Sequence, residues 1–245
     1  MDALPLVICP TFGERDNLEE LTAGIWQAVP AAHVLLVDDA SGDGTPAWAR
    51  SHASFGRSLH LLARPGQAGL GTAYRDGFRW ALERGYGWIA QMDADLSHDP
   101  ADLPLLLTEA RRGADLVLAA RPLEALPTAA GRSAVSRAGA LAARALLGLP
   151  FADPTGGFKC WRREALAQID LDRVAAKGYA FQIETTHRAW RLGMAVVEVP
   201  VVVRERRAGA SKMNGTIVGE ALWTLLRLAW AGRSPDGEAG TKPAA

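Results

Sequence analysis

The fold assignment starts from residues 88–98, whose sequence is WIAQMDADLSH. The first half of this segment is a short apolar run, typical of a buried strand, and two aspartates follow it directly. Because alternate residues of an extended chain point to one side, we expect Asp93 and Asp95 to present their carboxylates together. In open α/β sheets, ligands bind at the carboxyl ends of the strands. The segment therefore predicts an α/β sheet with an acidic ligand site where this strand ends.

The alternation of strands and helices extends on both sides of this segment. Five apolar, β-prone runs are predicted strands, at residues 4–9, 33–37, 59–63, 88–92 and 115–120. Segments with the apolar spacing of a helix lie between them, at residues 18–29, 45–53, 73–84 and 103–112. This order predicts a mostly parallel sheet that is covered by helices on both faces.

The second half of the chain follows a looser pattern, which begins with a loop that contains Pro122 and Pro127. The elements predicted after it are helices at 133–147, 181–192 and 216–231, a glycine-rich stretch at 155–158 and a strand at 195–203. We find no internal repeat. We therefore expect one domain over residues 1–232 and a flexible tail over residues 233–245, which are rich in Gly, Pro and Ala.

The composition is that of an ordinary globular protein. Of 245 residues, 49% are apolar and 22% are charged, and 27 basic residues balance 27 acidic ones. No apolar stretch reaches the roughly 20 residues of a membrane-spanning helix, and Asp2 stands where a secretory signal would carry a cation. Two cysteines, Cys9 and Cys160, are too few for a disulfide framework. We therefore expect a cytoplasmic protein.

Charge is distributed unevenly along the chain. Residues 1–43 carry eight acidic side chains against Arg15 alone, whereas residues 204–212 carry four cations against Glu205. A nucleic-acid-binding protein has a broad basic excess, which this chain lacks, so we expect no nucleic acid as a partner. A short basic cluster suits a compact anion such as a phosphate.

Two acidic clusters fall at predicted strand ends. Asp38 and Asp39 follow the second strand, and Asp93 and Asp95 follow the fourth. Two carboxylates are what Mg²⁺ or Mn²⁺ takes from a protein when a diphosphate completes its coordination. In a plainer interpretation, Asp38 or Asp39 caps the helix that follows.

Three other signals also have plain interpretations beside the functional ones. The second Asp-x-Asp of the chain, at 170–172, is interpreted as coincidence. His98 is either a metal ligand or, as we favour, a polar loop histidine that water satisfies. Residues 69–71 have the sequence Gly-Leu-Gly and could be part of a dinucleotide-binding loop, but a glycine turn before a helix is favoured.

The helix at 216–231 is apolar almost all round. Its apolar residues fall on two faces, Val218, Leu222, Leu225 and Ala229 on one and Trp223, Leu226 and Trp230 on the other. The remaining polar stripe is thin and consists of Glu220, Thr224 and Arg227. This pattern leaves a core helix and an amphipathic membrane-surface helix equally open.

Seven ordered blocks of the sequence resemble a known family. Four of them, residues 10–18, 37–45, 69–74 and 92–98, are similar to glycosyltransferase family 2. Three more, residues 153–159, 178–184 and 206–213, narrow the resemblance to the polyprenyl (dolichyl) phosphate mannose synthases, and the similarity runs over residues 4–213. The chain departs from the family at Gly13, where Asn is common, and at 119–122, where Gly-Ser-Arg-Tyr is usual.

This resemblance implies a GT-A fold and a glycosyltransferase that moves mannose from GDP-mannose to a polyprenyl phosphate, with inversion at the anomeric carbon. It implies Mg²⁺ or Mn²⁺ as the cofactor. It also implies a peripheral position on the cytoplasmic face of a membrane, where the acceptor lies, and allows for a membrane-embedded partner protein.

The resemblance assigns site residues by their motif positions. The metal ligands would be Asp93, Asp95 and Ser97. The nucleotide sugar would contact Pro10, Phe12, Glu14, Val37, Asp39, Asp93, Ala94, Asp95, Arg121, Arg206 and Lys212. The catalytic group would be Asp95, Arg121, Arg132 and Ser136, of which Arg132 and Ser136 would handle the acceptor phosphate.

The chemistry of such a transfer also follows from residue types. A departing diphosphate needs charge neutralisation, which a divalent cation, Arg206 and Lys212 can supply. A phosphate monoester, with a second pKa of about 6, is mostly a dianion at neutral pH and needs little help from a general base. A hydroxyl acceptor would need a carboxylate, for which Asp153 and Glu184 are candidates, and neither is assigned.

Other functions stay open on the sequence alone. A family 2 enzyme that uses UDP-glucose or another nucleotide sugar with a polyprenyl phosphate is the nearest alternative. A nucleotide-binding module without catalysis would explain Asp38 and Asp39 but gives no role to the basic cluster at 204–212. A sugar-nucleotide pyrophosphorylase ranks low, because residues 10–17 are acidic and nearly free of glycine.

Overall fold

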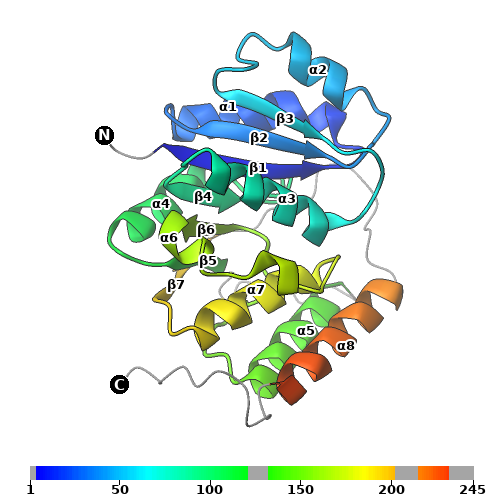
Figure 1. Ribbon diagram of the computed structural model, residues 1–245, viewed down its shortest axis with the longest axis vertical. Coiled ribbons are helices and arrows are strands. Elements are labelled where there is room, and N and C mark those ends of the chain that lie inside the picture. Colours follow the sequence, from blue (N-terminus) through cyan, green and yellow to red (C-terminus); the bar gives the residue numbers. More distant parts are fainter. Residues whose placement is uncertain (1–3, 121–131, 202–214, 232–245) are drawn as a thin grey trace.

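The computed structural model describes residues 4–120, 132–201 and 215–231, which contain one seven-stranded sheet (Figure 1). The strands are β1 (Pro5–Thr11), β2 (His33–Asp38), β3 (Leu59–Ala63), β4 (Trp88–Gln91), β5 (Leu116–Ala120), β6 (Lys159–Arg162) and β7 (Val196–Pro200). Their order in the sheet is β3-β2-β1-β4-β6-β5-β7. Neighbouring strands are parallel except at β6, which runs antiparallel to β4 and β5. The mostly parallel sheet predicted from the sequence is confirmed.

Helices connect the strands along the described parts of the chain. They are α1 (Leu18–Ala28), α2 (Thr45–Ser51), α3 (Leu70–Glu83), α4 (Leu103–Arg111), α5 (Arg132–Leu147), α6 (Arg163–Leu166), α7 (Ala180–Arg191) and α8 (Gly215–Ala231). Short 3-10 turns lie at Arg15–Asn17, Pro100–Asp102 and Leu171–Arg173. Each helix predicted from the sequence is present, with ends that shift by a few residues.

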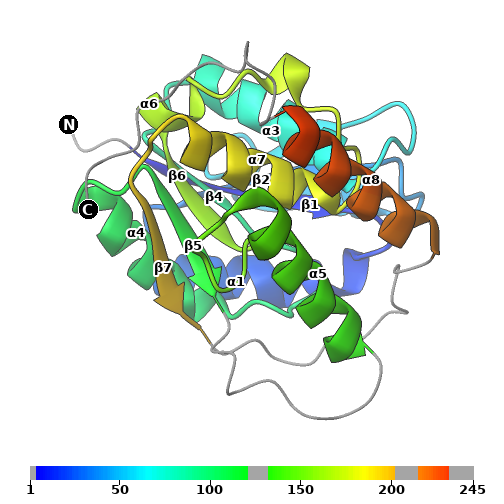
Figure 2. The same cartoon turned by 90° about the horizontal axis from the view of Figure 1, so that it is seen from below.

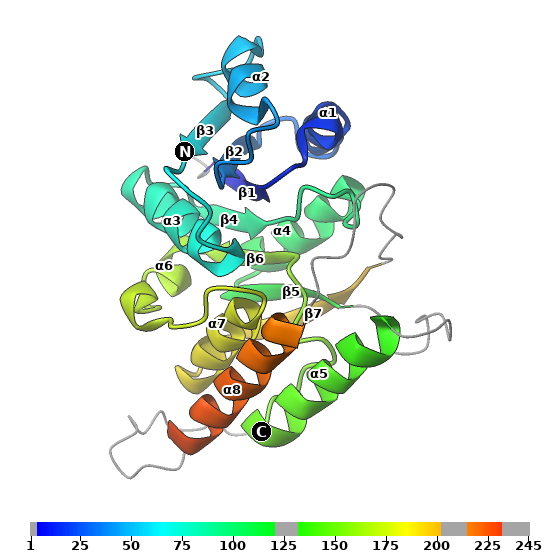
Figure 3. The ribbon, with the colours of Figure 1, turned by 90° about the vertical axis from the view of Figure 1, so that its right-hand side faces the viewer.

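Alternation along the strands divides the core between the two faces of the sheet. In β1, Leu6 and Ile8 join the apolar cluster of α3 and α7, whereas Val7 and Cys9 join the cluster of α1 and α4. Figure 3 shows α1 and α4 on one side of the sheet and α3 and α7 on the other. Because β1 is covered on both faces, it has a continuous apolar sequence and not an alternating one.

α5 and α8 form a further layer beyond α7. They lie side by side in Figures 1 and 2, and α8 also contacts α7. Ala143 of α5, Ile183 of α7 and Leu225 of α8 form a small apolar core between the three helices. This layer lies at the β7 end of the molecule, away from β3 (Figure 1).

The polar stripe of α8 faces the protein. Glu220 accepts hydrogen bonds from the backbone N–H groups of Lys177 (2.8 Å) and Gly178 (3.0 Å). Arg227 forms an ion pair with the buried Glu184 at 2.7 Å. The exposed side is apolar, with Leu222, Trp223, Leu226 and Trp230 exposed by 53%, 61%, 54% and 78%. α8 therefore contributes to the core through Leu225 and Leu228, while Trp223 and Trp230 are exposed, and the membrane-surface helix stays a prediction.

The sequence pattern does not predict β6, the antiparallel strand between β4 and β5. β6 begins with Lys159, a residue type that usually marks the surface, yet Lys159 is fully buried here. Its Nζ donates hydrogen bonds to the carbonyl of Gln182 (2.7 Å) and to Oγ1 of Thr186 (2.8 Å), both on α7. Burial lowers the pKa of Lys159 to about 7, against the attraction of Asp153.

Several predicted segments lie outside the described residues. These are the loop around Pro122 and Pro127, the basic cluster at 204–212 and the tail at 233–245. In the parts of the chain that are described, the helices are too short or too polar to cross a bilayer.

Candidate active site

The carboxyl ends of the parallel strands β1, β2 and β4 lie together at one edge of the sheet. In the parallel register Thr11 pairs with Asp38, and Ile8 pairs with Gln91, so the three strands end close together. The loops that follow β2 and β4 carry the two acidic clusters. The register therefore brings these clusters to one site, as expected where an α/β sheet binds its ligand.

Asp38 and Asp39 organise the loops around the end of β2. The buried Asp38 accepts hydrogen bonds from Oγ1 of Thr11 (3.1 Å) and Oγ of Ser41 (2.7 Å). Asp39 accepts from the N–H groups at residues 68 (3.1 Å) and 69 (3.0 Å), and forms an ion pair with Arg64 at 2.8 Å. Asp39 thus fixes the glycine turn that leads into α3.

Neither of these aspartates caps α2, so the capping alternative is wrong. The helix begins after Gly44, whose φ is +89°, and its first N–H group, that of Thr45, is bonded by Asp43 at 2.9 Å. Burial opposes the charged form of Asp43, but hydrogen bonds from Ser41, Thr45 and the N–H of Arg15 outweigh it and lower its pKa to about 2. Asp43 therefore stays ionised and holds the loop between β2 and α2.

The residues assigned to the nucleotide near β1 differ in accessibility. Pro10 and Val37 pair in the register between β1 and β2, and the side chain of Val37 is fully buried in the core. Phe12 lies just beyond β1 and is exposed by 36%. Glu14 accepts a hydrogen bond from Nδ2 of Asn17 at 2.8 Å. Of these four residues Phe12 is the most exposed, since Pro10 and Glu14 are half-buried and Val37 is buried.

Asp93 lies directly beyond β4 between two features of the fold. Its Oδ1 accepts a hydrogen bond from the hydroxyl of Tyr74 at 3.0 Å. On the other side lies Gly157, where an added Cβ would stand 3.2 Å from Oδ2 of Asp93. The backbone N–H of Asp93 donates to Nδ1 of His98 at 3.3 Å. The carboxylate is therefore confined by the phenol, the glycine and its own loop.

Asp95 is held by the turn that follows it. Its Oδ1 accepts hydrogen bonds from the N–H (3.1 Å) and the Oγ (2.6 Å) of Ser97. Leu96 between them has a φ of +60°, an uncommon conformation for a side chain of this size. Asp95 is exposed by 6% and Ala94 by 2%, so the loop packs tightly against the sheet.

His98 closes this loop. Its Nδ1 accepts the N–H of Asp93, and its ring stacks on Phe158 with centroids 5.1 Å apart. The sequence favours a polar loop histidine satisfied by water, and the structure adds that the loop backbone is a hydrogen-bond partner of this ring. The imidazole thereby ties Asp93 to the segment around Gly157.

The donor set at this site fits a divalent cation. Asp93, Asp95 and Ser97 offer carboxylate and hydroxyl oxygens, which are the hard ligands that Mg²⁺ and Mn²⁺ prefer. Within the described ranges, no group of three or more His, Cys, Asp and Glu side chains is placed to hold a metal ion. Mg²⁺ usually takes one or two carboxylates from a protein and completes its coordination with water and substrate phosphates.

The second Asp-x-Asp differs from the first in its surroundings. Asp170 accepts hydrogen bonds from the N–H groups of Asp172 and Arg173 and begins a 3-10 turn. The side chain of Asp172 is exposed by 83% and pairs with Arg79. These contacts give the motif a local structural role, which agrees with its interpretation as coincidence.

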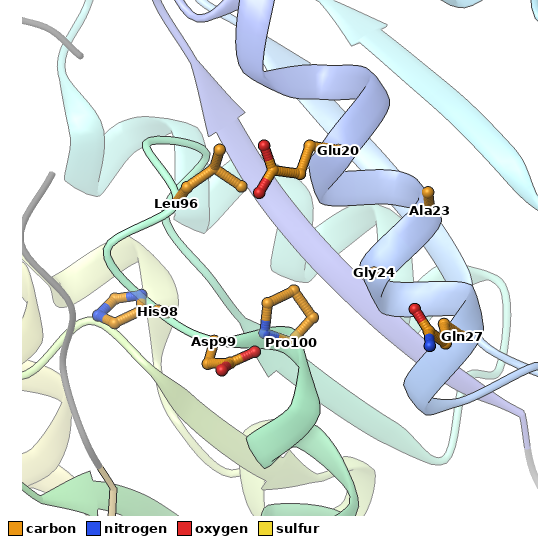
Figure 4. A pocket seen from close by; sticks show the side chains of 8 residues that line it. All are labelled: Glu20, Ala23, Gly24, Gln27, Leu96, His98, Asp99 and Pro100. Carbon is orange, nitrogen blue, oxygen red and sulfur yellow. The ribbon is translucent and has the colours of Figure 1, made fainter. Parts of the chain in front are cut away.

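A pocket lies on the α1 side of the loop that carries Asp95. It is lined by Glu20, Ala23, Gly24, Gln27, Leu96, His98, Asp99 and Pro100 (Figure 4). None of the residues assigned to the nucleotide sugar or the metal lines this pocket. The pocket is therefore separate from the candidate active site. Leu96 and His98 line it and also belong to the loop that carries Asp93 and Asp95.

Comparison with known proteins identifies the family. Residues 6–170 match the pattern described as Glycosyl transferase family 2, and this match covers more than half of the chain. The chain belongs to glycosyl transferase family 2. An undecaprenyl-phosphate mannosyltransferase from Micrococcus luteus is 46% identical over 233 residues, which are 93% of this chain and 95% of that protein. A polyprenol monophosphomannose synthase from Mycolicibacterium smegmatis is 41% identical over 235 residues, which are 93% and 88%.

Solved structures of other glycosyltransferases share the fold. A glucosyl-3-phosphoglycerate synthase from Mycobacterium tuberculosis, in complex with Mn²⁺, UDP and glucosyl-3-phosphoglycerate, has a TM-score of 0.72 at 21% identity and covers 96% of this chain and 82% of its own. A mannosyltransferase from Pyrobaculum calidifontis, in complex with GDP-Man and Mn²⁺, has a TM-score of 0.57 at 20% identity and covers 98% and 77%. The expected GT-A-like fold of a single domain is confirmed.

The structure brings only part of the predicted site of this family 2 transferase together. Asp39, Asp93, Ala94, Asp95 and Ser97 lie at the ends of β2 and β4, beside Pro10 and Phe12 at the end of β1. Arg121, Arg206 and Lys212 lie outside the described residues. Arg132 and Ser136 lie in the first half of α5, where only the backbone is described.

The two candidate bases have different surroundings in this transferase. Glu184 is fully buried and forms ion pairs with Arg188 (3.0 Å) and Arg227 (2.7 Å), so its charge is compensated within the protein. Asp153 is exposed by 7% and accepts hydrogen bonds from the N–H (3.2 Å) and Oγ1 (2.5 Å) of Thr155. Glu184 therefore has a structural role, and Asp153 orders the glycine-rich loop before β6.

Sequence reasoning missed two neighbours of the acidic pair in this transferase. Tyr74 and Gly157 enter the sequence analysis only as parts of the blocks 69–74 and 153–159. Both contact Asp93, at sequence separations of 19 and 64 residues. Contacts over such separations leave no periodic signal, so the structure is needed to find them.

Proposed function

We propose that this enzyme transfers mannose from GDP-mannose to a polyprenyl phosphate, with inversion at the anomeric carbon and with Mg²⁺ or Mn²⁺ as its cofactor. The proposal rests on one observation, the pair Asp93 and Asp95 oriented at the end of β4 in a chain that aligns over nine-tenths of its length with named mannosyltransferases. The Mn²⁺ complexes of its structural neighbours support a divalent cation.

In this proposal the residues divide the charge of the reaction between them. Asp93 and Asp95, with Ser97 beside them, would hold the cation, which neutralises the negative charge of the departing diphosphate. Arg121, Arg206 and Lys212 would bind phosphate groups. Pro10, Phe12, Glu14, Val37 and Asp39 would surround the nucleotide.

The acceptor explains why no general base is assigned. A polyprenyl phosphate is mostly a dianion at neutral pH and attacks without losing a proton. Arg132 and Ser136 on α5 would hold it close to the anomeric carbon and so lower the entropic part of the barrier. This agrees with Glu184, whose charge two arginines already compensate.

The acceptor also implies a membrane, and α5 and α8 offer a surface for one. We call this surface the outer apolar face; its residues are Leu141, Leu146, Leu222, Trp223, Leu226 and Trp230, all exposed by 44% or more. Paired helices with outward leucines and tryptophans are typical of proteins that lie in the interface of a bilayer. We propose that this face rests on the cytoplasmic side of the membrane that contains the acceptor.

The transfer assay tests the proposed function directly. The purified protein is incubated with a short polyprenyl phosphate, Mn²⁺ and either labelled GDP-mannose or labelled UDP-glucose, and products are extracted into organic solvent. We expect label in the organic phase from GDP-mannose, and its loss on addition of EDTA. Label from UDP-glucose alone would favour the alternative donor, and no label from either donor would contradict the proposal.

A further inference from the structure

Tyr74 contacts the acidic pair from the interior of the protein. It is fully buried in the first half of α3, and its hydroxyl donates to Oδ1 of Asp93 at 3.0 Å. A phenol hydroxyl has one hydrogen to donate, and here the carboxylate of Asp93 receives it.

The position of this hydroxyl is fixed by packing. The ring of Tyr74 stacks on Phe181 with centroids 6.2 Å apart and contacts Phe78 at 6.3 Å. The start of α3 is itself anchored, because the N–H of Gly71 donates to the carbonyl of Lys177 at 2.7 Å and an added Cβ at Gly71 would stand 2.7 Å from Cβ of Phe181. Because packing fixes the ring, the hydroxyl stays in one place and can hold a hydrogen-bonded partner in position.

The backbone at Gly157 also comes close to the carboxylate of Asp93. An added Cβ at Gly157 would stand 3.2 Å and 3.4 Å from the two carboxylate oxygens, which is closer than ordinary contact. A side chain at this position would force the carboxylate to shift by a few tenths of an ångström. The phenol and the close approach of this glycine therefore both favour the present position of the carboxylate.

A neutral donor suits a carboxylate that has to receive a cation. Each carboxylate oxygen has two lone pairs, so Oδ1 can accept the phenol and still approach a metal. A guanidinium in the same place would compensate the charge that attracts the cation. Partners that hydrogen-bond to metal ligands orient them, and their loss typically weakens metal binding by about 10- to 100-fold.

We infer that Tyr74 is a positioning residue, whose buried hydroxyl holds the carboxylate of Asp93 in the orientation that binds the divalent cation. The inference rests on the proposed function, since it presumes that Asp93 and Asp95 form the metal site. It gives a role to the block at 69–74 that the glycine turn alone does not explain.

The variant Y74F removes the hydroxyl and keeps the ring. Mn²⁺ binding is measured by titration with the electron paramagnetic resonance signal of free Mn²⁺, in the presence of GDP, and thermal unfolding is recorded in parallel. We expect the Kd for Mn²⁺ to rise by about 10- to 100-fold, with a melting temperature close to that of the unchanged protein. In the transfer assay, excess Mn²⁺ should restore much of the lost rate.

The matched control is Y86F. The hydroxyl of Tyr86 bonds Nδ1 of His33 at 2.7 Å, at the start of β2 and so at the opposite end of the strands. This variant also loses one phenol hydroxyl and should bind Mn²⁺ as the unchanged protein does. A second probe, Gly157→Ala, displaces the same carboxylate from the other side and should also weaken Mn²⁺ binding.

The outcomes separate this inference from the proposed function. Equal Kd values for Mn²⁺ in Y74F, Gly157→Ala and the unchanged protein would overturn the role of Tyr74 and leave the metal site in place. Failure of the unchanged protein to bind Mn²⁺ more tightly than D93A would overturn the metal site, and the inference with it. Weaker binding in Y74F but not in Y86F supports the inference.

Discussion

The loop after β4 and the α7–α8 layer both hold carboxylates, but with different partners. Asp93 and Asp95 accept hydrogen bonds from Tyr74 and Ser97, which are neutral donors. Glu184, between α7 and α8, is paired with Arg188 and Arg227. A neutral donor orients a carboxylate and leaves its charge available, whereas a guanidinium compensates that charge.

This difference separates a site for a cation from a structural tie. The α7–α8 ion pairs fix α8 to the body of the protein, together with the bonds from Glu220 to the chain at 177–178. Asp93 instead accepts its hydrogen bond from a neutral phenol, at the strand ends where an α/β sheet binds its ligand. Variants in the two regions should therefore fail in different ways, either in activity or in stability.

The largest expected effect is the loss of activity in D93A. Removing one of two carboxylates from a shared cation site should lower kcat/KM for transfer by about 10³-fold, or about 4 kcal/mol of transition-state stabilisation. The free energy of unfolding should fall by about 1–3 kcal/mol, because the hydroxyl of the buried Tyr74 loses its acceptor, and the protein should remain folded. Steady-state kinetics and urea unfolding measure the two quantities.

The control for this variant is D172A, in the second Asp-x-Asp. Asp172 is highly exposed. The ion pair described for it is with Arg79, which is also exposed. Its loss should leave kcat/KM unchanged. Equal activity of D93A and D172A would contradict the distinction between the two motifs.

The next effect is on stability and concerns E184Q. This change removes the buried negative charge and leaves Arg188 and Arg227 without their partner, which should cost about 3 kcal/mol of unfolding free energy. The exposed variant E164Q should cost less than about 0.5 kcal/mol. Mn²⁺ binding by folded E184Q should match that of the unchanged protein. A loss of Mn²⁺ binding at unchanged stability would show that Glu184 belongs to the active site.

A smaller effect concerns pH and arises on the same helix, α7. Burial, with the positive charges of Arg191 and Arg188, lowers the pKa of His187 to about 4, while Glu184 opposes the shift. The unfolded chain binds a proton at this histidine at a pKa of about 6.5, and the folded protein does so only near pH 4. The stabilising contribution is therefore complete above pH 6.5 and declines as the pH falls toward 4.

We expect His187 to account for about 2 kcal/mol of this acid destabilisation, given that the ring keeps some exposure. Unfolding free energies of the unchanged protein and H187Q, measured between pH 7 and pH 4, give the difference in slope. The variant H52Q, outside α7, serves as the control. Parallel curves for H187Q and the unchanged protein would contradict the prediction.

The sequence predicts every strand of the described sheet except β6. The strands β1, β2 and β5 are buried along nearly their whole length, and burial of that kind leaves continuous apolar runs. β6 is different, because its Lys159 is buried through bonds to Gln182 and Thr186, 23 and 27 residues away. A buried lysine can be recognised only when its distant partners are known.

The same limit applies to the candidate site. Asp93 and Asp95 are found from sequence because they follow an apolar strand. The orientation of Asp93, however, depends on Tyr74 of α3 and on Gly157 in the loop before β6.

In α8 the sequence shows a thin polar stripe but not whether that stripe faces the protein or the solvent. The direction depends on Glu184, a buried acid on another helix, which draws Arg227 inward.

The smallest expected effect on the fold comes from the outer apolar face. In the double variant W223S/W230S two side chains that are exposed by 61% and 78% become polar, so the unfolding free energy should change by less than about 0.5 kcal/mol. Binding to the membrane should nevertheless fall, because interfacial attachment scales with the apolar area that enters the bilayer. Co-sedimentation with vesicles of phosphatidylglycerol and phosphatidylethanolamine measures this binding.

The control for the double variant is L105S on α4, whose leucine is exposed by 50% but lies on a helix that covers the sheet. We expect at least a tenfold loss of vesicle binding in the double variant, equivalent to about 1.4 kcal/mol, and none in L105S. Equal sedimentation of both variants would remove the outer apolar face as the membrane contact, and binding only to vesicles that contain a membrane protein would assign that face to a protein partner. If only W223S/W230S loses vesicle binding, the α7–α8 layer is the part of the protein that contacts the membrane. The two regions would then differ in function as well as in the partners of their carboxylates.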